Sequence, residues 1–390
     1  MPHAGIIESF FYIFAGAAVL ATFALYTRQP MLVAYVALGC LLGPFGMSWV
    51  DDPALLSEVA EFGIIFLLFL VGLDLQPSKL KNMVGESLLT ALVTTLAFFA
   101  IGFTVLLGFG FTLIEAAVTG IAASFSSTIL GIKLLPTTAL HHRHVGELVV
   151  ALLLIQDLLA ILAILLLNGL GVDAAALLTS VASIFIGLPL LALLAFLGVK
   201  YGLLYLIRAF DAFHEYIFLL AIGWCVAIAH LAAFFGLSLE IGAFIAGVSL
   251  ATSPISQYIA ESLRPLRDFF LVLFFFSVGA ALNIGLLPEV WLPAIILAGL
   301  LIALKPVVFA GLLRFQGEET KVAWEVGYRL GQASEFSLLL SYIAIANALV
   351  GEKAALIIQF STVLTLVLSS YFVIFRYPSP IAPNPKLRRD

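Results

Sequence analysis

The feature that most constrains this chain is a succession of long apolar stretches separated by short polar breaks. A helix that crosses a bilayer needs about 20 apolar residues, and stretches of about that length recur along nearly the whole sequence. Of the 390 residues, 63% are hydrophobic and 11% are charged, whereas a soluble domain is about half apolar and a quarter charged. The sequence therefore predicts an all-α polytopic membrane protein.

We expect about 13 transmembrane helices, the seventh of which is long and the ninth short. Their expected spans are 6–27, 31–47, 54–75, 85–109, 113–135, 145–168, 174–206, 213–235, 237–252, 266–286, 290–313, 322–348 and 353–376. Together they form one transmembrane domain, 1–376, followed by a short cytoplasmic tail, 377–390.

Lysine and arginine fix the expected orientation. One set of alternate connections carries only Lys353, whereas the opposite set and the tail carry Arg28, Lys79, Lys81, Lys133, Arg143, Lys200, Arg208, Arg264, Arg267, Arg314, Lys321, Arg376, Lys386, Arg388 and Arg389. Connections rich in lysine and arginine stay in the cytoplasm. We therefore expect a multi-pass protein of the inner (plasma) membrane, with its N-terminus outside and its C-terminus in the cytoplasm.

Similar residues recur at one spacing. Gly39 and Gly247 are 208 residues apart, as are Ser126 and Ser334, and similar segments around Gly72 and Gly279 are 207 apart. Seven spans separate the copies, so the copies cross the membrane in opposite directions. The sequence predicts an inverted-topology repeat, with one copy at about 31–168 and the other at about 237–376, as in many secondary transporters.

Two polar motifs interrupt the apolar spans at the repeat spacing. They are Ser124-Phe-Ser126-Ser127-Thr128 in span five and Gly331-Gln332-Ala-Ser334-Glu335 in span twelve. Glycine and hydroxyl side chains let a helix break at membrane depth, because hydroxyl oxygens satisfy the freed amides. We expect two crossed broken helices whose half-helix ends point into one cavity. The alternative is ordinary helix packing through small residues.

Asp157 is the ionisable residue within an otherwise apolar run in span six, near the middle of the bilayer. A carboxylate there costs several kcal/mol unless it faces water, an ion or a partner charge. It can hold either a proton or a dehydrated alkali cation, which is the minimum needed for exchange. We expect Asp157, Gln156, Ser126, Ser127 and Thr128 to form the proton and cation site. The alternative for Asp157 is a structural ion pair.

Three further charges lie within the spans. Lys305 precedes Pro306 in span eleven, and a buried ammonium implies a nearby carboxylate, for which Asp157 and Glu335 are the candidates. Lys305 either competes with the cation for Asp157 or braces the crossing. For Glu335 we expect a structural role at the helix ends. Arg329 follows Glu325 at the spacing of a helical ion pair.

These motifs, taken in order, resemble the Kef-type potassium/proton branch of the monovalent cation:proton antiporter superfamily. The resemblance covers nearly the whole chain, including Gly63-Ile-Ile-Phe-Leu-Leu-Phe-Leu-Val-Gly-Leu-Asp74-Leu-Gln-Pro, Gln156-Asp157 and Gly331-Gln-Ala-Ser-Glu335-Phe. It implies a homodimer whose protomers have a dimerisation domain and a mobile core domain. It also implies elevator-type alternating access, with Asp157 as the ion-binding carboxylate.

The resemblance has departures. Kef proteins carry a nucleotide-binding domain after the last span, whereas this sequence stops at Asp390, and the acidic loop after span nine is altered, so glutathione control is not expected. Gln156-Asp157 resembles potassium-preferring members, while Lys305-Pro306 resembles electrogenic sodium exchangers. Both features enter the choice of ion.

Our leading hypothesis is potassium/proton exchange. Sodium/proton exchange on the same site, a channel-like potassium efflux pathway, and sodium-coupled transport of an organic acid are the alternatives; few polar residues are present to bind an organic ligand. The sequence contains no hydrolase motif, phosphate loop or metal-ligand cluster. We expect no enzyme, no cofactor, no nucleic-acid partner, and no metal other than the transported K⁺ or Na⁺.

Overall fold

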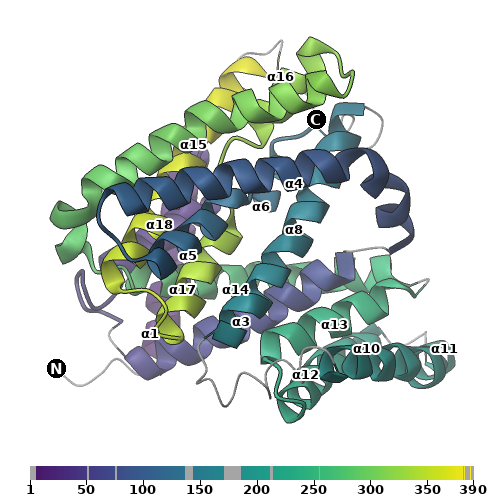
Figure 1. Cartoon of the computed structure of the whole chain (residues 1–390). Helices are drawn as coiled ribbons and strands as arrows, with labels where there is room; N and C mark the ends of the chain where they lie inside the picture. The colour runs from purple at the N-terminus through teal and green to yellow at the C-terminus, as the bar shows by residue number, and fades with distance from the viewer. Residues whose placement is uncertain are drawn as a thin grey trace. The chain divides into compact units, whose positions relative to one another are not determined.

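The computed structural model describes residues 6–50, 52–74, 77–136, 144–170, 186–210, 214–253, 255–380, 382 and 387. The start of the predicted span 174–206 and most of the predicted tail 377–390 lie outside the described residues. Within the described ranges the regular elements are helices (Figure 1). The predicted all-α polytopic class is therefore confirmed.

Helices follow one another along the chain. The first ten are α1 (Ile6–Tyr26), α2 (Met31–Leu42), α3 (Pro53–Asp74), α4 (Pro77–Gly108), α5 (Leu113–Ser124), α6 (Thr128–Lys133), α8 (His144–Leu170), α10 (Leu188–Leu197), the π-helix η2 (Gly198–Leu203) and α11 (Leu204–Ala209). The others are α12 (His214–Phe234), α13 (Leu239–Ala251), α14 (Ser256–Ala280), the 3₁₀-helix η3 (Ile284–Leu286), α15 (Leu287–Phe315), α16 (Thr320–Arg329), α17 (Glu335–Ala346) and α18 (Glu352–Arg376).

The described helices match the predicted spans in order, but their ends differ. Eight helical segments in the described ranges are long and apolar enough to cross a membrane, and further apolar helices are shorter, so the predicted number of thirteen spans stays a prediction. Helix α14 begins at Ser256, whereas the predicted span begins at 266. The prediction missed the first turns because their side chains are polar. An apolar stretch identifies only the membrane-embedded part of a helix, whereas backbone hydrogen bonding continues through polar turns.

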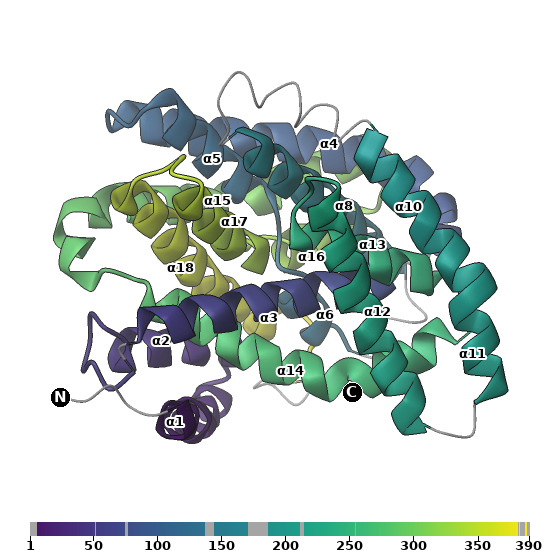
Figure 2. The ribbon, with the colours of Figure 1, turned by 90° about the horizontal axis from the view of Figure 1, so that it is seen from below.

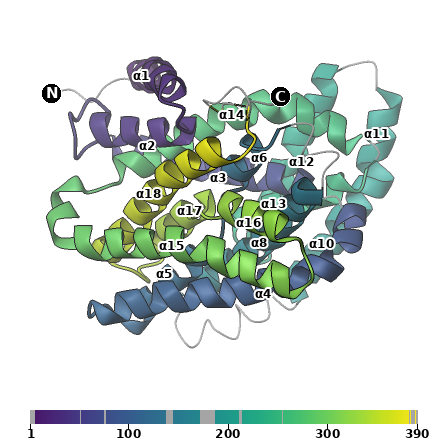
Figure 3. The ribbon, with the colours of Figure 1, turned by 90° about the horizontal axis from the view of Figure 1, so that it is seen from above.

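One compact unit consists of Met1–Asp51, Met83–Leu167 and Val278–Asp390. Within it α15 lies along α16 and α18, and α17 lies against α18 and α5 (Figure 3). A buried apolar cluster joins α4, α8, α15 and α16, with the rings of Phe98 and Phe309 5.5 Å apart. The helices that carry Asp157, Lys305 and Arg329 thus share one core.

The second compact unit consists of Asp52–Asn82 and Asn168–Ser277. In it α10, η2 and α11 follow one another without interruption, and α12 and α13 lie beside α10 (Figure 2). Helix α13 crosses α3 at Gly72 and Gly247, where an added Cβ at either glycine would collide with the opposite backbone. Glycine is required here because the two backbones touch.

A matching close approach occurs in the first unit. There the Cβ of any residue replacing Gly279 in α14 would collide with the Val36 carbonyl in α2. Gly72 and Gly279 stand at the spacing that the sequence predicts for an inverted repeat. Helix α3 of the first copy meets α13 of the second, and α14 of the second meets α2 of the first. The two contacts thus join corresponding positions of the two predicted copies, the arrangement expected of an inverted repeat.

Candidate ion-binding site

The predicted break in span five is present. Helix α5 ends at Ser124 and α6 begins at Thr128, with Phe125 in an extended conformation (φ −95°, ψ 156°) between them. Side-chain oxygens satisfy freed backbone groups: the Ser127 hydroxyl caps α6 by accepting a hydrogen bond from the Leu130 amide (3.1 Å). The prediction of a broken helix, rather than ordinary packing through small residues, is confirmed here.

The second predicted break separates α16 from α17. The Ser334 hydroxyl caps α17 by accepting from the Phe336 amide (3.1 Å), and the Ser337 hydroxyl accepts from the Ser334 amide (3.3 Å). Hydroxyl groups also join the two interrupted helices directly. Ser126 Oγ donates to the Leu330 carbonyl (2.8 Å), and Ser337 Oγ donates to the Ala122 carbonyl (2.6 Å). The two broken helices therefore meet at their breaks.

Asp157 lies on α8 beside the first break. Its side chain is 4% exposed, and the Thr128 hydroxyl lies 2.9 Å from Asp157 Oδ1 and 3.0 Å from Oδ2. The neighbouring Gln156 accepts a hydrogen bond from the Ser126 amide through its Oε1 atom (3.0 Å). Two consecutive side chains of α8 thus contact the break, Gln156 at Ser126 and Asp157 at Thr128. The structure brings together all five predicted ion-site residues, Ser126, Ser127, Thr128, Gln156 and Asp157.

The Lys305 ammonium is fully buried among backbone carbonyls of the crossing. Its Nζ atom donates to the Phe125 carbonyl (2.6 Å), to the Gln332 carbonyl (3.0 Å) and, at 3.4 Å, to the Ser126 hydroxyl. Phe125 is the C-cap of α5, where carbonyl groups lack helical partners and the helix dipole is negative. These contacts give Lys305 the geometry of a brace across both breaks.

Charges of opposite sign lie at the two ends of the short helix α6. At its first turn the Glu335 carboxylate accepts a hydrogen bond from the Ile129 amide (3.2 Å). At its last turn Arg329 donates to the Leu134 carbonyl (2.9 Å), while it also pairs with Glu325 at 2.7 Å. Carboxylates suit free N–H groups and guanidinium suits free carbonyls, so both charges match the ends that they contact.

Sequence reasoning missed Thr365, and it quoted Gln332 without giving it a role. Thr365 on α18 accepts a hydrogen bond from the Ala333 amide in the second break (2.9 Å), and Gln332 Oε1 accepts one from the Ser369 hydroxyl (3.0 Å). A signal for Thr365 was available. It stands 208 residues after Asp157, the spacing that relates the two breaks.

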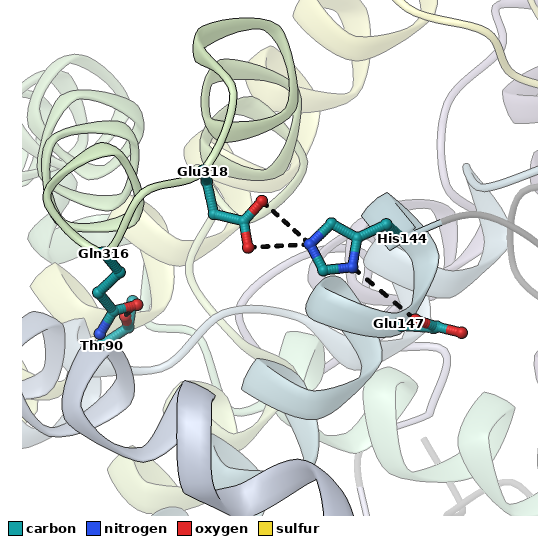
Figure 4. A network of polar contacts seen from close by, with 5 residues as sticks. All are labelled: Thr90, His144, Glu147, Gln316 and Glu318. Atoms are coloured by element: carbon teal, nitrogen blue, oxygen red, sulfur yellow. Dashed lines mark hydrogen bonds and ion pairs between the residues drawn. The ribbon is translucent and has the colours of Figure 1, made fainter.

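The first residue of α8, His144, forms a separate polar contact. Its Nε2 atom lies 2.8 Å from Glu318, its Nδ1 atom lies 3.8 Å from Glu147, and nearby Thr90 donates to Gln316 (Figure 4). The neighbouring His141, His142 and Arg143 lie outside the described residues. This cluster ties α4, α8 and the turn between α15 and α16 together, and none of its residues was predicted as part of the ion site.

Comparison with known proteins identifies the family of this chain. Residues 10–375 match the family model of the sodium/hydrogen exchanger transmembrane domain. The chain is 32%, 31% and 30% identical to the K(+) efflux antiporters 4, 5 and 6 of Arabidopsis thaliana, in each case over 87% of this chain. It spans 58%, 61% and 58% of those relatives, which are thus considerably longer.

A solved structure has the same fold. The sodium proton antiporter MjNhaP1 from Methanocaldococcus jannaschii, determined at pH 8, superposes with a TM-score of 0.71 at 17% identity. The superposition covers 94% of this chain and 96% of that one. The predicted resemblance to monovalent cation:proton antiporters of the Kef type is confirmed, and the chain belongs to the sodium/hydrogen exchanger transmembrane family.

Proposed function

We propose that this protein is a secondary-active antiporter that exchanges potassium for protons, with Asp157 as the shared site. The observation that carries the proposal is the buried Asp157 carboxylate, hydrogen-bonded to Thr128 at the first residue of a broken helix. A carboxylate at membrane depth needs either a proton or a cation beside it. Because one group cannot hold both at once, loading one releases the other.

Nearby oxygens supply candidate ligands for a dehydrated cation. The Thr128 hydroxyl contacts Asp157, and Ser126, Ser127 and Gln156 contribute hydroxyl and carbonyl oxygens at the same break. The Glu335 Oε2 atom is buried and has no hydrogen-bond partner among the described residues. An acceptor oxygen without a donor suits a cation or a proton. In this proposal Glu335 contributes to the charge of the site as well as to the end of α6.

The ion preference rests on two supports. Oxygen ligands that are mostly neutral suit a large, weakly hydrated cation, and the similar Arabidopsis proteins are named K(+) efflux antiporters. With Lys305 engaged by backbone carbonyls, Asp157 is the group that exchanges its proton. The proposed stoichiometry is therefore one proton for one potassium ion, without net charge movement.

The proposal extends to assembly and movement. The protein would work as a homodimer in the inner membrane, with its N-terminus outside and its C-terminus in the cytoplasm, as the distribution of lysine and arginine predicts. The domain 1–376 would contain repeats at about 31–168 and 237–376. Elevator-type alternating access would carry the crossed helices and Asp157 as one body.

The decisive experiment measures proton movement in proteoliposomes driven by an outward potassium gradient. Asp157→Asn keeps the size of the side chain and its acceptor for the Thr128 hydroxyl, but it cannot carry charge. We expect its exchange rate to fall by at least about 100-fold, equivalent to about 2.7 kcal/mol. An unchanged elution profile and melting temperature would establish that the variant is folded. Persistent exchange would overturn the assignment.

Sodium/proton exchange is the second candidate, because the fold neighbour is a sodium proton antiporter and Lys305-Pro306 resembles electrogenic sodium exchangers. The same liposomes distinguish the two when sodium replaces potassium at equal concentration. A larger proton flux with sodium would assign sodium. Cation flux without any proton movement would instead indicate a channel-like efflux pathway.

A further inference from the structure

A cavity lies away from the proposed ion site, between the first turns of α16 and the end of α18. Its volume is about 500 Å³. Its walls include Lys321, Trp324, Glu325, Tyr328, Arg376 and Tyr377. Both helices belong to the same compact unit. The ion-exchange function uses none of these side chains directly.

The charge on the walls is positive. Lys321 and Arg376 are both exposed, and the Arg376 guanidinium lies 5.2 Å from the centre of the Tyr328 ring. The acidic residue of the wall, Glu325, is already paired with the buried Arg329 at 2.7 Å. Among the described ion pairs neither Lys321 nor Arg376 has a carboxylate partner, so both charges can face an anion. The first amides of α16 begin beside Lys321 and favour an anion as well.

Aromatic rings form the rest of the lining. The Tyr328 ring lies 5.8 Å from Trp324 and 5.7 Å from Tyr377, measured between ring centres. Partial burial raises the pKa of the Tyr377 phenol, and its hydroxyl can donate a hydrogen bond to a ligand. Trp and Tyr are enriched where a membrane span ends, at the level of the lipid headgroups. The cavity lies at such a level because α18 ends at Arg376.

We propose that this cavity binds a phosphate-bearing anion. Lys321 and Arg376 hold the phosphate, and the adjoining part of the ligand rests on Trp324 and Tyr328. Two sources share this chemistry: the headgroup of an anionic phospholipid and a soluble phosphate compound. The position at the end of a membrane span favours the headgroup.

The cavity is one contact away from the crossed helices. Two wall residues contact Arg329. Glu325 Oε1 lies 2.7 Å from Arg329 Nη2, and the centre of the Tyr377 ring lies 6.0 Å from Arg329 Cζ. Arg329 in turn donates to the Leu134 carbonyl at the end of α6 and to the Pro378 carbonyl after α18. A bound anion would lie beside the Glu325–Arg329 pair, whose guanidinium holds this end of α6. A bound lipid headgroup would thereby influence the ion site through the contacts of Arg329 with Glu325 and Leu134.

The test measures binding of short-chain phosphatidylglycerol to the purified full chain in zwitterionic nanodiscs by calorimetry. We expect Lys321→Gln and Arg376→Gln each to weaken binding by about fivefold, the usual effect of one cation near a lipid surface. Lys321→Arg keeps the charge and should bind within about twofold of the original chain, since lysine and arginine contribute about equally near an anionic lipid surface. The matched control is Arg314→Gln, which removes an exposed cation at the end of α15, outside the cavity.

A loss in Arg314→Gln as large as that in Lys321→Gln would overturn the site, since general surface charge would then explain binding. Unchanged binding in both cavity variants would overturn it as well. A parallel titration with inorganic phosphate separates the sources: binding that depends on Lys321 assigns a soluble ligand, and its absence beside lipid binding assigns the headgroup. None of these measurements requires transport, so their failure is distinct from failure of the exchange assay.

Discussion

The two helix breaks have the same architecture but different chemistry. Each lies against the helix that follows it: α8 contacts the first break and α18 contacts the second. At corresponding positions, 208 residues apart, stand Asp157 and Thr365. Asp157 accepts from the Thr128 hydroxyl, whereas the Thr365 hydroxyl accepts from the Ala333 amide. One copy of the repeat carries a charge where the other completes a hydrogen bond.

The same asymmetry holds at two further pairs with this spacing. Ser127 corresponds to Glu335, and Ala97 corresponds to Lys305. In the proposed function the first predicted copy therefore supplies the ion-binding carboxylate, Asp157, and the second supplies charges that contact both breaks. Both breaks contain glycine or hydroxyl residues that end or cap a helix, whereas the proposed chemistry needs each charge only once.

The largest effect is expected from making the first break resemble the second. Asp157→Thr removes the charge but keeps a hydroxyl, and we expect potassium-driven proton flux to fall by at least about 100-fold. The double variant Asp157→Thr/Thr365→Asp returns the carboxylate to the membrane, but beside the wrong break. We expect it to remain inactive in the proteoliposome assay, because Gln156 and Thr128 lie at the first break and not beside position 365.

Recovered exchange in the double variant would show that the two breaks are interchangeable. Thr365→Asp alone serves as the control for folding and for any effect of a second carboxylate. Each variant is compared at equal amounts of monodisperse protein.

A smaller effect, on stability, is expected from Lys305→Met. The substitution leaves the carbonyls of Phe125 and Gln332 buried without this donor, which costs about 2–4 kcal/mol. Thermal unfolding in detergent measures the loss. A double-mutant cycle with Ser126→Ala should show coupling, because Lys305 contacts that hydroxyl. A cycle with Asp157→Asn should be additive within about 0.5 kcal/mol. Stronger coupling to Asp157 would make Lys305 its counter-ion and revise the proposed stoichiometry.

The smallest effect is expected from Thr365→Val. The valine removes the acceptor of the Ala333 amide, which should lower stability by about 1–2 kcal/mol while potassium-driven exchange continues. Thr94→Val is the matched control, because the buried Thr94 hydroxyl donates only within its own helix, to Thr90 and Ala91, among the described contacts. Loss of exchange in Thr365→Val with intact folding would show that the second break takes part in transport chemistry.

Much of this arrangement follows from sequence because a membrane limits the choices. Polar side chains in apolar spans are rare, so the motifs around Ser126 and Ser334 stand out, and both mark real breaks. The positions that contact Asp157 were predictable for the same reason. The repeat spacing could also have identified Thr365, but one hydroxyl in an apolar helix is ordinary and carries no signal by itself.

Directions of long side chains were less predictable. The sequence places Lys305 at membrane depth, but it does not reveal that the ammonium points toward carbonyls of two breaks from α15. The cavity beside α16 was unpredictable for another reason. Lys321 and Arg376 lie far apart along the chain and are exposed, and charges near span ends are common. Hydropathy predicts where a helix lies along the chain, but it does not predict that the start of α16 lies beside the end of α18.

Helix α6 has only six residues, and both of its ends are held by side chains of the other repeat, Glu335 and Arg329. A segment held at both ends has no hinge of its own. If the ion is carried across the membrane, the residues around it would move together as one rigid group, without opening and closing around the ion. A covalent staple between α6 and α16 should therefore be harmless to transport, and the joints that bend must be sought outside the crossing.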